Sequence, residues 1–107
     1  MANNFLLTKV ELPEAYWPQE GRQKLSAVQH FLFMQCEQSH SYEVSTATLY
    51  QAYSSWSYQT EHPQLSLPEF GRLISEILRT NDEITEVKRA GVDARRGYRG
   101  IRLKQEL

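Results

Sequence analysis

Residues 66–80 read SLPEFGRLISEILRT, a stretch that combines a helix start with a strong amphipathic repeat. Ser66 and Glu69 have the spacing of a capping box, and Pro68 is favoured in a first helical turn. Apolar residues then recur at helical spacing, at positions 70, 73, 74, 77 and 78. We therefore expect a helix that starts after Ser66, ends near residues 79–80 and buries one face.

The segment before this helix predicts two further helices and a short strand. An apolar stripe predicts the first helix at about residues 22–38. The alternating residues 42–44 predict a small strand. A second helix is expected at about residues 46–58, with Ser45 or Thr46 as its cap.

Two strand-like runs follow the third helix. They are expected at residues 84–89 and 98–103, on either side of the loop AGVDARRG at residues 90–97. In this loop Gly91 and Gly97 would permit turns with positive φ and a close backbone approach. The element order predicts an α+β fold. It is that of a winged helix, a helix-turn-helix variant with three main helices and a small antiparallel sheet that ends in a β-hairpin wing.

Length and composition bound the class of protein. The chain has 107 residues, 40% of them hydrophobic, which is the size of one ordinary domain. Residues 1–20 contain Pro13 and Pro18 and are expected to form an irregular arm or linker before a winged-helix domain at residues 21–107.

The single cysteine and the hydropathy indicate where the protein acts. Cys36 cannot form an internal disulfide, and no apolar run approaches the roughly 18–20 residues that span a bilayer. The N-terminus lacks the pattern of a secretory signal. We expect a cytoplasmic domain of a longer protein, without a membrane partner.

The charge is strongly divided along the chain. Residues 88–104 hold seven basic residues and one acidic residue, whereas residues 1–87 hold five basic and eleven acidic residues. Such asymmetry is informative about partners rather than about fold. A basic hairpin is a natural counterpart of the phosphates of double-stranded DNA, which we expect as the partner.

The candidate contacts lie on the third helix and on the hairpin. Arginine can hold guanine in a bidentate pair and a carboxylate can accept from cytosine, so the solvent-facing side of the helix is expected in the major groove. The hairpin cations are expected on phosphates. The candidate DNA-binding residues are Arg72, Ser75, Glu76 and Arg79 on the helix, and Lys88, Arg89, Arg95, Arg96, Arg99 and Arg102 on the hairpin.

These contacts have structural alternatives. Glu76 lies four residues after Arg72 and three before Arg79, so the three side chains could simply pair on a solvent-facing helix. The hairpin cations could merely discourage the pairing of strand edges.

The aromatic residues of the second helix also allow two interpretations. Tyr50, Tyr53 and Trp56 could stack on single-stranded bases, but their helical spacing favours the core. We expect Trp56 and Phe70 to be buried.

The sequence offers little for catalysis. It has no phosphate-binding loop of the pattern G-x-x-x-x-G-K-[ST]. Cys36 and His40 stand four residues apart, but two ligands fall short of a zinc site, and the three histidines have no triad context. We therefore predict no catalytic residue, no metal site and no cofactor, and we do not expect this chain by itself to be an enzyme.

Four blocks of sequence occur in an order that resembles a known family. The blocks VQHFLFMQCE, LYQAYSSW, PQLSLPEFGRLISE and RRGYRGIRL, within about residues 25–104, resemble the C-terminal winged-helix domain of phage- and plasmid-type primase–helicase replication proteins, of which the satellite-phage type is best known. The resemblance implies binding to origin DNA repeats in a bacterial host cell, with the helicase and primase activities elsewhere in the parent protein.

The resemblance also points to particular residues. It implies DNA contacts by Arg72, Arg95, Arg96 and Arg99, and packing roles for Phe70, Trp56 and Tyr98. The acidity of the third helix departs from what DNA binding favours, which leaves open whether the helix or the wing dominates. A second class therefore stays open, a winged-helix protein–protein interaction or homo-oligomer module without DNA contact.

Overall fold

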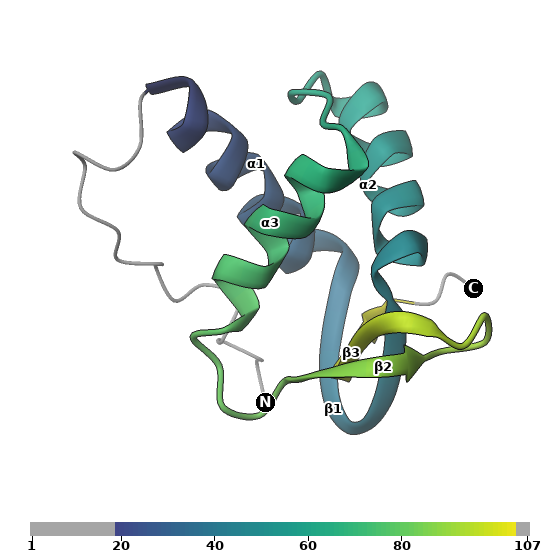
Figure 1. Ribbon diagram of the computed structural model, residues 1–107. Helices are drawn as coiled ribbons and strands as arrows, with labels where there is room; N and C mark the ends of the chain where they lie inside the picture. The colour runs from purple at the N-terminus through teal and green to yellow at the C-terminus, as the bar shows by residue number, and fades with distance from the viewer. Residues whose placement is uncertain (1–18, 105–107) are drawn as a thin grey trace.

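Three helices and three strands make up the part of the chain that the computed structural model describes, residues 19–104 (Figure 1). In chain order they are α1 (Gln19–Gln35), β1 (Cys36–Ser45), α2 (Thr46–Thr60), α3 (Leu67–Leu78), β2 (Thr85–Ala90) and β3 (Arg95–Leu103). The arm predicted at residues 1–20 lies outside the described residues, except for its last two, which are helical.

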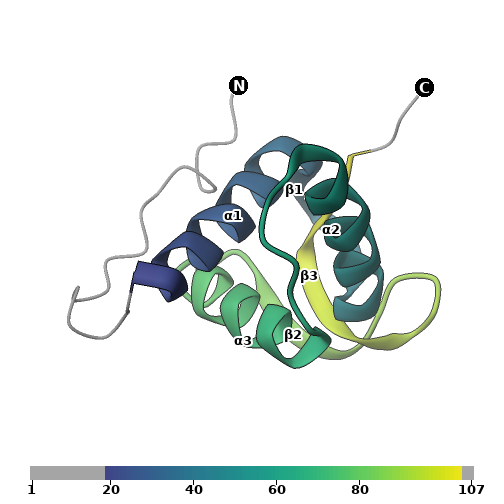
Figure 2. The same ribbon diagram turned by 90° about the horizontal axis from the view of Figure 1, so that it is seen from above.

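The strands form one antiparallel sheet in the order β1-β3-β2. β3, the last strand in the chain, therefore lies in the middle of the sheet. It pairs on one side with β1, the strand between α1 and α2, and on the other with β2, which follows α3. The helices pack together while the sheet closes one end of the bundle, as Figures 1 and 2 show. This is the layout of a winged helix, and the predicted α+β fold class is confirmed.

The core lies where the three helices meet the inner face of the sheet. Phe31, Tyr53 and Phe70, one from each helix, are fully buried. Their ring centroids are 5.3–6.3 Å apart, a range in which aromatic pairs attract one another. The predicted burial of Phe70 is thus confirmed. Trp56 is only partly buried, so the prediction that it lies in the core is wrong in degree.

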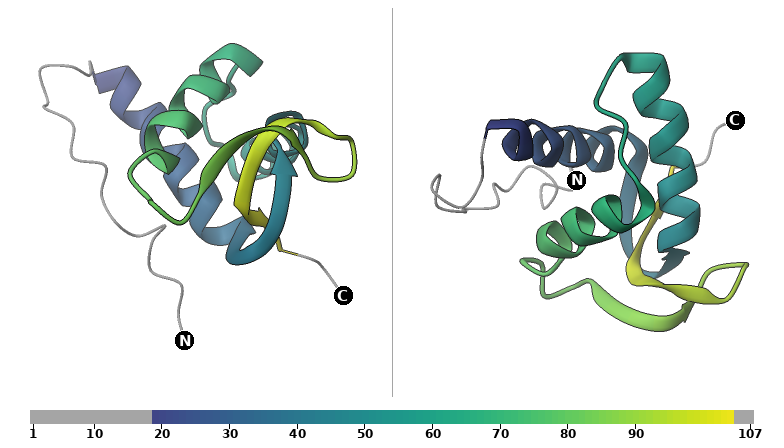
Figure 3. Two further views of the ribbon diagram at one scale, coloured as in Figure 1. Left: turned by 60° about the horizontal axis from the view of Figure 1, so that its bottom comes forward. Right: turned by 45° about the horizontal axis from the view of Figure 1, so that its top comes forward.

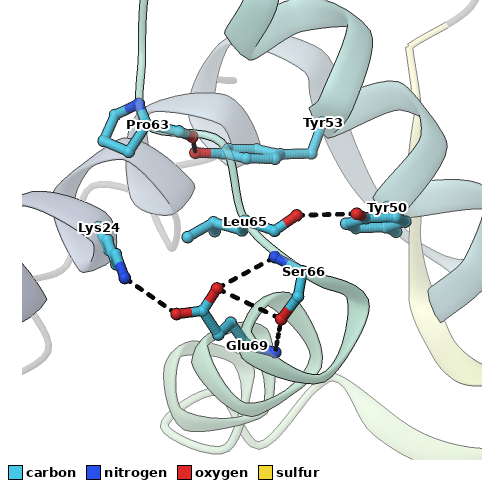
Figure 4. Close-up of polar contacts among 7 residues, drawn as sticks. All are labelled: Lys24, Tyr50, Tyr53, Pro63, Leu65, Ser66 and Glu69. Carbon is cyan, nitrogen blue, oxygen red and sulfur yellow. Dashed lines mark hydrogen bonds and ion pairs between the residues drawn. The ribbon is translucent and has the colours of Figure 1, made fainter.

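The connection between α2 and α3 is fixed by hydrogen bonds to backbone carbonyls. The Tyr50 hydroxyl donates to the carbonyl of Leu65, and the Tyr53 hydroxyl donates to that of Pro63, both at 2.7 Å (Figure 4). Burial raises the pKa of Tyr53 to about 12, so this hydroxyl keeps its proton and stays a donor.

The start of α3 confirms the predicted capping box. The Ser66 hydroxyl accepts from the backbone N–H of Glu69, while the Glu69 carboxylate accepts from that of Ser66. The second carboxylate oxygen of Glu69 accepts from Lys24 of α1 at 2.9 Å (Figure 4). This N-terminal end is therefore fixed both within α3 and against α1.

Two boundaries differ from the sequence-based expectation at the first strand. Helix α1 ends at Gln35 rather than at residue 38, and β1 begins at once with Cys36, which pairs with Leu103. The buried Cys36 continues the apolar spacing of the helix but does so from a strand. Periodicity alone could not show this change because it depends on pairing with a strand 67 positions further along.

The hairpin loop is also shorter than expected. Strand β3 already begins at Arg95, so Arg95 and Arg96 lie on a strand, and the loop consists of residues 91–94. Gly91 has φ of 73°, as predicted, but Gly97 does not have a positive φ. Gly97 is needed for close approach instead, since a Cβ there would overlap the backbone of Val44 in β1.

Candidate nucleic-acid interface

A bulge in β2 gathers three cations on the hairpin. Val87 pairs with Gly97 and Ala90 pairs with Arg95, so Lys88 and Arg89 together stand opposite Arg96. Two residues opposing one is the geometry of a β-bulge, which re-aims side chains and increases the local twist. Lys88, Arg89 and Arg96, here called the cationic cluster, are all exposed.

The charges of the cationic cluster are not paired with acidic side chains of the described residues. Among residues 19–104, none of its three members forms an ion pair, and neither does the adjacent Arg95. Four positive charges therefore face solvent at the loop end of the hairpin.

The other two predicted hairpin contacts are used inside the molecule. Arg99 pairs with Glu43 at 2.9 Å, and Arg102 pairs with Glu37 at 2.8 Å, both on the neighbouring strand β1. The Arg102 guanidinium also lies 3.6 Å from the centroid of the Tyr42 ring, a cation–π contact. Hydrogen bonds from Arg99 and from the Gly91 backbone lower the pKa of Glu43, so this carboxylate stays charged. Arg99 and Arg102 thus join β3 to β1.

The exposed face of α3 presents one arginine without an acidic partner. Glu76 lies 3.6 Å from Arg79, as the alternative of surface pairing predicts, but it does not pair with Arg72. Arg72 is exposed and forms no ion pair within the described part of the chain. Ser75 is half-buried and forms a side-chain hydrogen bond with Tyr98 of the hairpin.

A groove brings the helix and the hairpin together. It has a volume of about 330 Å³ and lies between α3, the start of α2 and the hairpin; its lining is Thr46, Ala47, Leu67, Gly71, Ser75, Glu86, Arg96 and Tyr98. Burial raises the pKa of Tyr98, and the Glu86 carboxylate adds to the rise, while Ser75, Arg79 and Arg96 lower it. Tyr98 thus lies in the groove with Ser75 of α3, Glu86 of β2 and Arg96 of β3, and Ser75 is its hydrogen-bond partner.

The predicted site residues therefore separate into three groups. Arg72 and Ser75 lie on α3 and Arg79 is its C-cap, and of these Ser75 lines the groove. The cationic cluster and Arg95 lie on the hairpin, and Arg96 lines the same groove. Glu76 is paired with Arg79 beside them. Arg99 and Arg102 lie on β3 but point to β1.

Sequence reasoning missed Asp93, the acidic residue of the hairpin loop. Its carboxylate accepts a hydrogen bond from Ser45, at the N-cap of α2, and so turns back onto the protein. The sequence offers no signal for this contact, because the two residues are 48 positions apart.

A second cleft lies on another part of the surface, between α1 and the α2–α3 connection. Its volume is about 700 Å³, and its lining includes His30 and His62. His62 stacks on Trp56 with ring centroids 4.4 Å apart, and His30 meets both rings edge-on. Trp56 thus lies at the margin of the core, with Phe31 and Tyr53 of the core beside its ring and the two imidazoles toward the cleft.

The described residues offer few candidates for metal binding or for a reactive thiol. Residues 19–104 contain no cluster of three or more side chains that could hold a metal ion. Burial raises the pKa of Cys36 to about 12, so its thiol stays protonated. None of the helices in this part of the chain is both long enough and apolar enough to cross a membrane.

Comparisons with known proteins give no further guide. No protein-family model, no curated protein and no solved structure matches this chain. Any functional conclusion therefore depends on the surface itself and on the sequence resemblance.

Proposed function

We propose that this domain binds double-stranded DNA through α3 and the hairpin. The observation that carries the proposal is the groove between the hairpin and α3, which Arg96 of the cationic cluster lines together with Gly71 and Ser75, next to the exposed Arg72 in the sequence of α3. DNA-binding helix-turn-helix folds place a helix in the major groove and use neighbouring elements to contact the backbone. A helix and a basic ribbon separated by a groove fit that division.

The two elements would do different work. The cationic cluster and Arg95 would neutralise phosphates, which supplies affinity without sequence information. Arg72 would reach base edges, where a bidentate pair with guanine gives discrimination. With about four phosphates neutralised, log K is expected to fall against log salt with a slope of about −3.5.

The acidic residues near the groove favour the hairpin as the main source of affinity. Glu86 lines the groove, and Glu76 stands on the helix beside it. Phosphates that approach α3 closely would be repelled by these carboxylates, whereas the loop end of the hairpin carries four cations without ion pairs. We therefore expect the helix to select the sequence and the hairpin to hold the DNA.

The finer part of the proposal is the biological setting. The resemblance to phage- and plasmid-type replication proteins supports a domain that recruits a primase–helicase to its replication origin in a bacterial cytoplasm. The surface described above is compatible with that task because origin repeats are duplex DNA.

A second candidate is docking on a protein partner without DNA contact. The observation that favours it is an apolar pair at the end of α1, where Phe33 is 41% exposed and Met34 is 46% exposed. Apolar residues of this size are normal singly, but adjacent ones can belong to an interface.

Fluorescence anisotropy with a labelled random duplex tests the DNA proposal. Wild-type protein should bind at low salt, and Arg89→Gln should bind more weakly. Lys104→Gln is the matched control because Lys104 belongs to the same basic stretch and is exposed but lies just after β3, away from the cluster. No binding by the wild type at low salt would overturn the proposal, and self-association in analytical ultracentrifugation would then support the second candidate.

A further inference from the structure

The hairpin loop is fastened to the first turn of α2 by one carboxylate. Asp93 Oδ2 accepts a hydrogen bond of 2.7 Å from the hydroxyl of Ser45. The same hydroxyl oxygen accepts from the backbone N–H of Thr48 at 3.0 Å as the N-cap of α2, and Ser45 is fully buried. The Thr48 hydroxyl lies 3.5 Å from the same carboxylate oxygen. The positive end of the α2 dipole favours a negative charge at this position.

A second carboxylate holds the loop at its other end. Glu43 Oε1 accepts from the backbone N–H of Gly91 at 3.4 Å, while its Oε2 accepts from Arg99 at 2.9 Å. In both views of Figure 3 the loop lies beside the end of α2 from which that helix starts. The loop is therefore held against β1 and α2 at two points.

The hairpin needs such contacts because little else orders its end. Strand β2 is at the edge of the sheet and pairs only with β3, and its bulge interrupts that pairing just before the loop. Short two-stranded ribbons have marginal stability in water. Ordering such a segment on binding costs free energy, which a preformed geometry avoids.

We propose that Asp93 is a positioning residue for DNA binding, which keeps the cationic cluster in its binding geometry by fastening the loop to the N-cap of α2. This inference depends on the proposed function. It predicts a result opposite to simple electrostatics. A carboxylate beside a phosphate-binding surface should weaken binding, so its removal should strengthen binding unless its hydrogen bond matters more.

Two variants of Asp93 separate charge from hydrogen bonding. Asp93→Asn and Asp93→Ala remove the same negative charge, but only asparagine retains an oxygen that can accept from Ser45. Asp93→Asn should bind duplex DNA at least as tightly as wild type, whereas Asp93→Ala should bind about three- to tenfold more weakly, the size that one hydrogen bond can supply. Glu86→Gln is the charge control, and it should bind more tightly because it removes a negative charge from the groove while the Glu86 side chain has no hydrogen bond to lose within residues 19–104.

A second measurement makes the test independent of DNA. Backbone ¹⁵N relaxation of the full chain should show increased motion at residues 91–94 in Asp93→Ala but not in Asp93→Asn, with the α2 and α3 amides unchanged. An Asp93→Ala loop as rigid as wild type, or equal DNA affinities for the two Asp93 variants, would overturn the inference. If the loop loosens as expected and none of the proteins binds duplex DNA, the fastening stands while the DNA function and the binding role of Asp93 fail.

Discussion

At the scale of single residues, the lack of a Cβ atom has opposite effects on stability at Gly97 and at Gly71. Gly97 lies in β3, where the backbone of Val44 occupies the place that a Cβ would need. Gly71 lies within α3 and has open space around the corresponding position. The first glycine is required by packing, whereas the second only weakens the helix.

Alanine at each position tests this difference. Gly97→Ala should destabilise the domain by about 3 kcal/mol or more, because β1 and β3 must separate to admit the methyl group. Gly71→Ala should stabilise it by about 0.4–1 kcal/mol, because alanine loses less backbone freedom on folding. Urea unfolding followed by circular dichroism measures both. Equal effects at the two positions would contradict the strand packing described above.

The ionisation of the Glu69 carboxyl group makes the folding stability of the domain depend on pH. Hydrogen bonds from Lys24 and from the Ser66 backbone lower its pKa from 4.5 to about 2. A carboxyl group with a depressed folded-state pKa contributes stability that is complete above about pH 4.5 and is lost as the pH falls through about 2.

Glu69→Gln isolates this contribution, because glutamine also fits a capping box but carries no charge for Lys24. We expect wild type to melt at a higher temperature than Glu69→Gln at pH 6. The difference should shrink steadily between pH 4.5 and pH 2. Thermal unfolding across this range measures the effect, and a melting-temperature difference that does not change with pH would exclude the proposed role.

At the scale of elements, α3 and the hairpin are held by different means. Helix α3 is fixed at its start by a capping box and an ion pair to α1, and along its length by five buried apolar residues. The hairpin is an edge ribbon, and its loop is held by polar contacts to β1 and α2. Rigid placement suits an element that reads bases, and a basic ribbon suits contact with phosphates.

This division predicts different losses for two arginines. Arg96→Ala should weaken all duplex sequences alike and reduce the salt slope by about one unit. Arg72→Ala should instead reduce discrimination by about 1–3 kcal/mol at one base pair and change the affinity for random DNA less. Competition binding with a randomised duplex library, repeated at several salt concentrations, separates the two. Both side chains are exposed, so unchanged melting temperatures serve as the control.

At the scale of the whole molecule, the core joins one aromatic ring from each helix. Phe70→Ala should cost about 3–5 kcal/mol, because Phe70 is fully buried and contacts Phe31, Tyr53 and Tyr50. Trp56→Ala should cost less, since Trp56 is partly exposed beside His62. Denaturant unfolding compares them, with the exposed Phe33→Ala expected to change stability by about 0.5 kcal/mol or less. A larger loss of stability for Trp56→Ala than for Phe70→Ala would show that the core is not centred on Phe70.

In the folded molecule, several of the charged residues in positions 88–104 are paired with other parts of the protein. Two of the seven basic residues pair with acids of β1, and the one acidic residue is bound to the N-cap of α2. Of the five that remain, the three of the cationic cluster and Arg95 lie at the loop end of the hairpin, and Lys104 lies just after β3. The proposed binding surface is therefore smaller than the basic stretch.

Features that depend on neighbouring residues could be predicted from the sequence. The capping box at Ser66, the apolar face of α3, the element order and the basic stretch were all predictable, because helix caps and amphipathic repeats act over a few positions. These local signals were sufficient for the α+β winged-helix fold class.

Which cations face outward depends instead on long-range pairing in the folded chain. The end of α1 at Gln35, the bulge that sets Lys88 and Arg89 against Arg96, and the pairing of Arg102 with Glu37 depend on strand register. Arg102 and Glu37 are 65 positions apart in the sequence. Register is set when the inner face of the sheet packs on the helices, because a shift of one residue would turn every buried side chain outward. No local pattern in the chain contains that information.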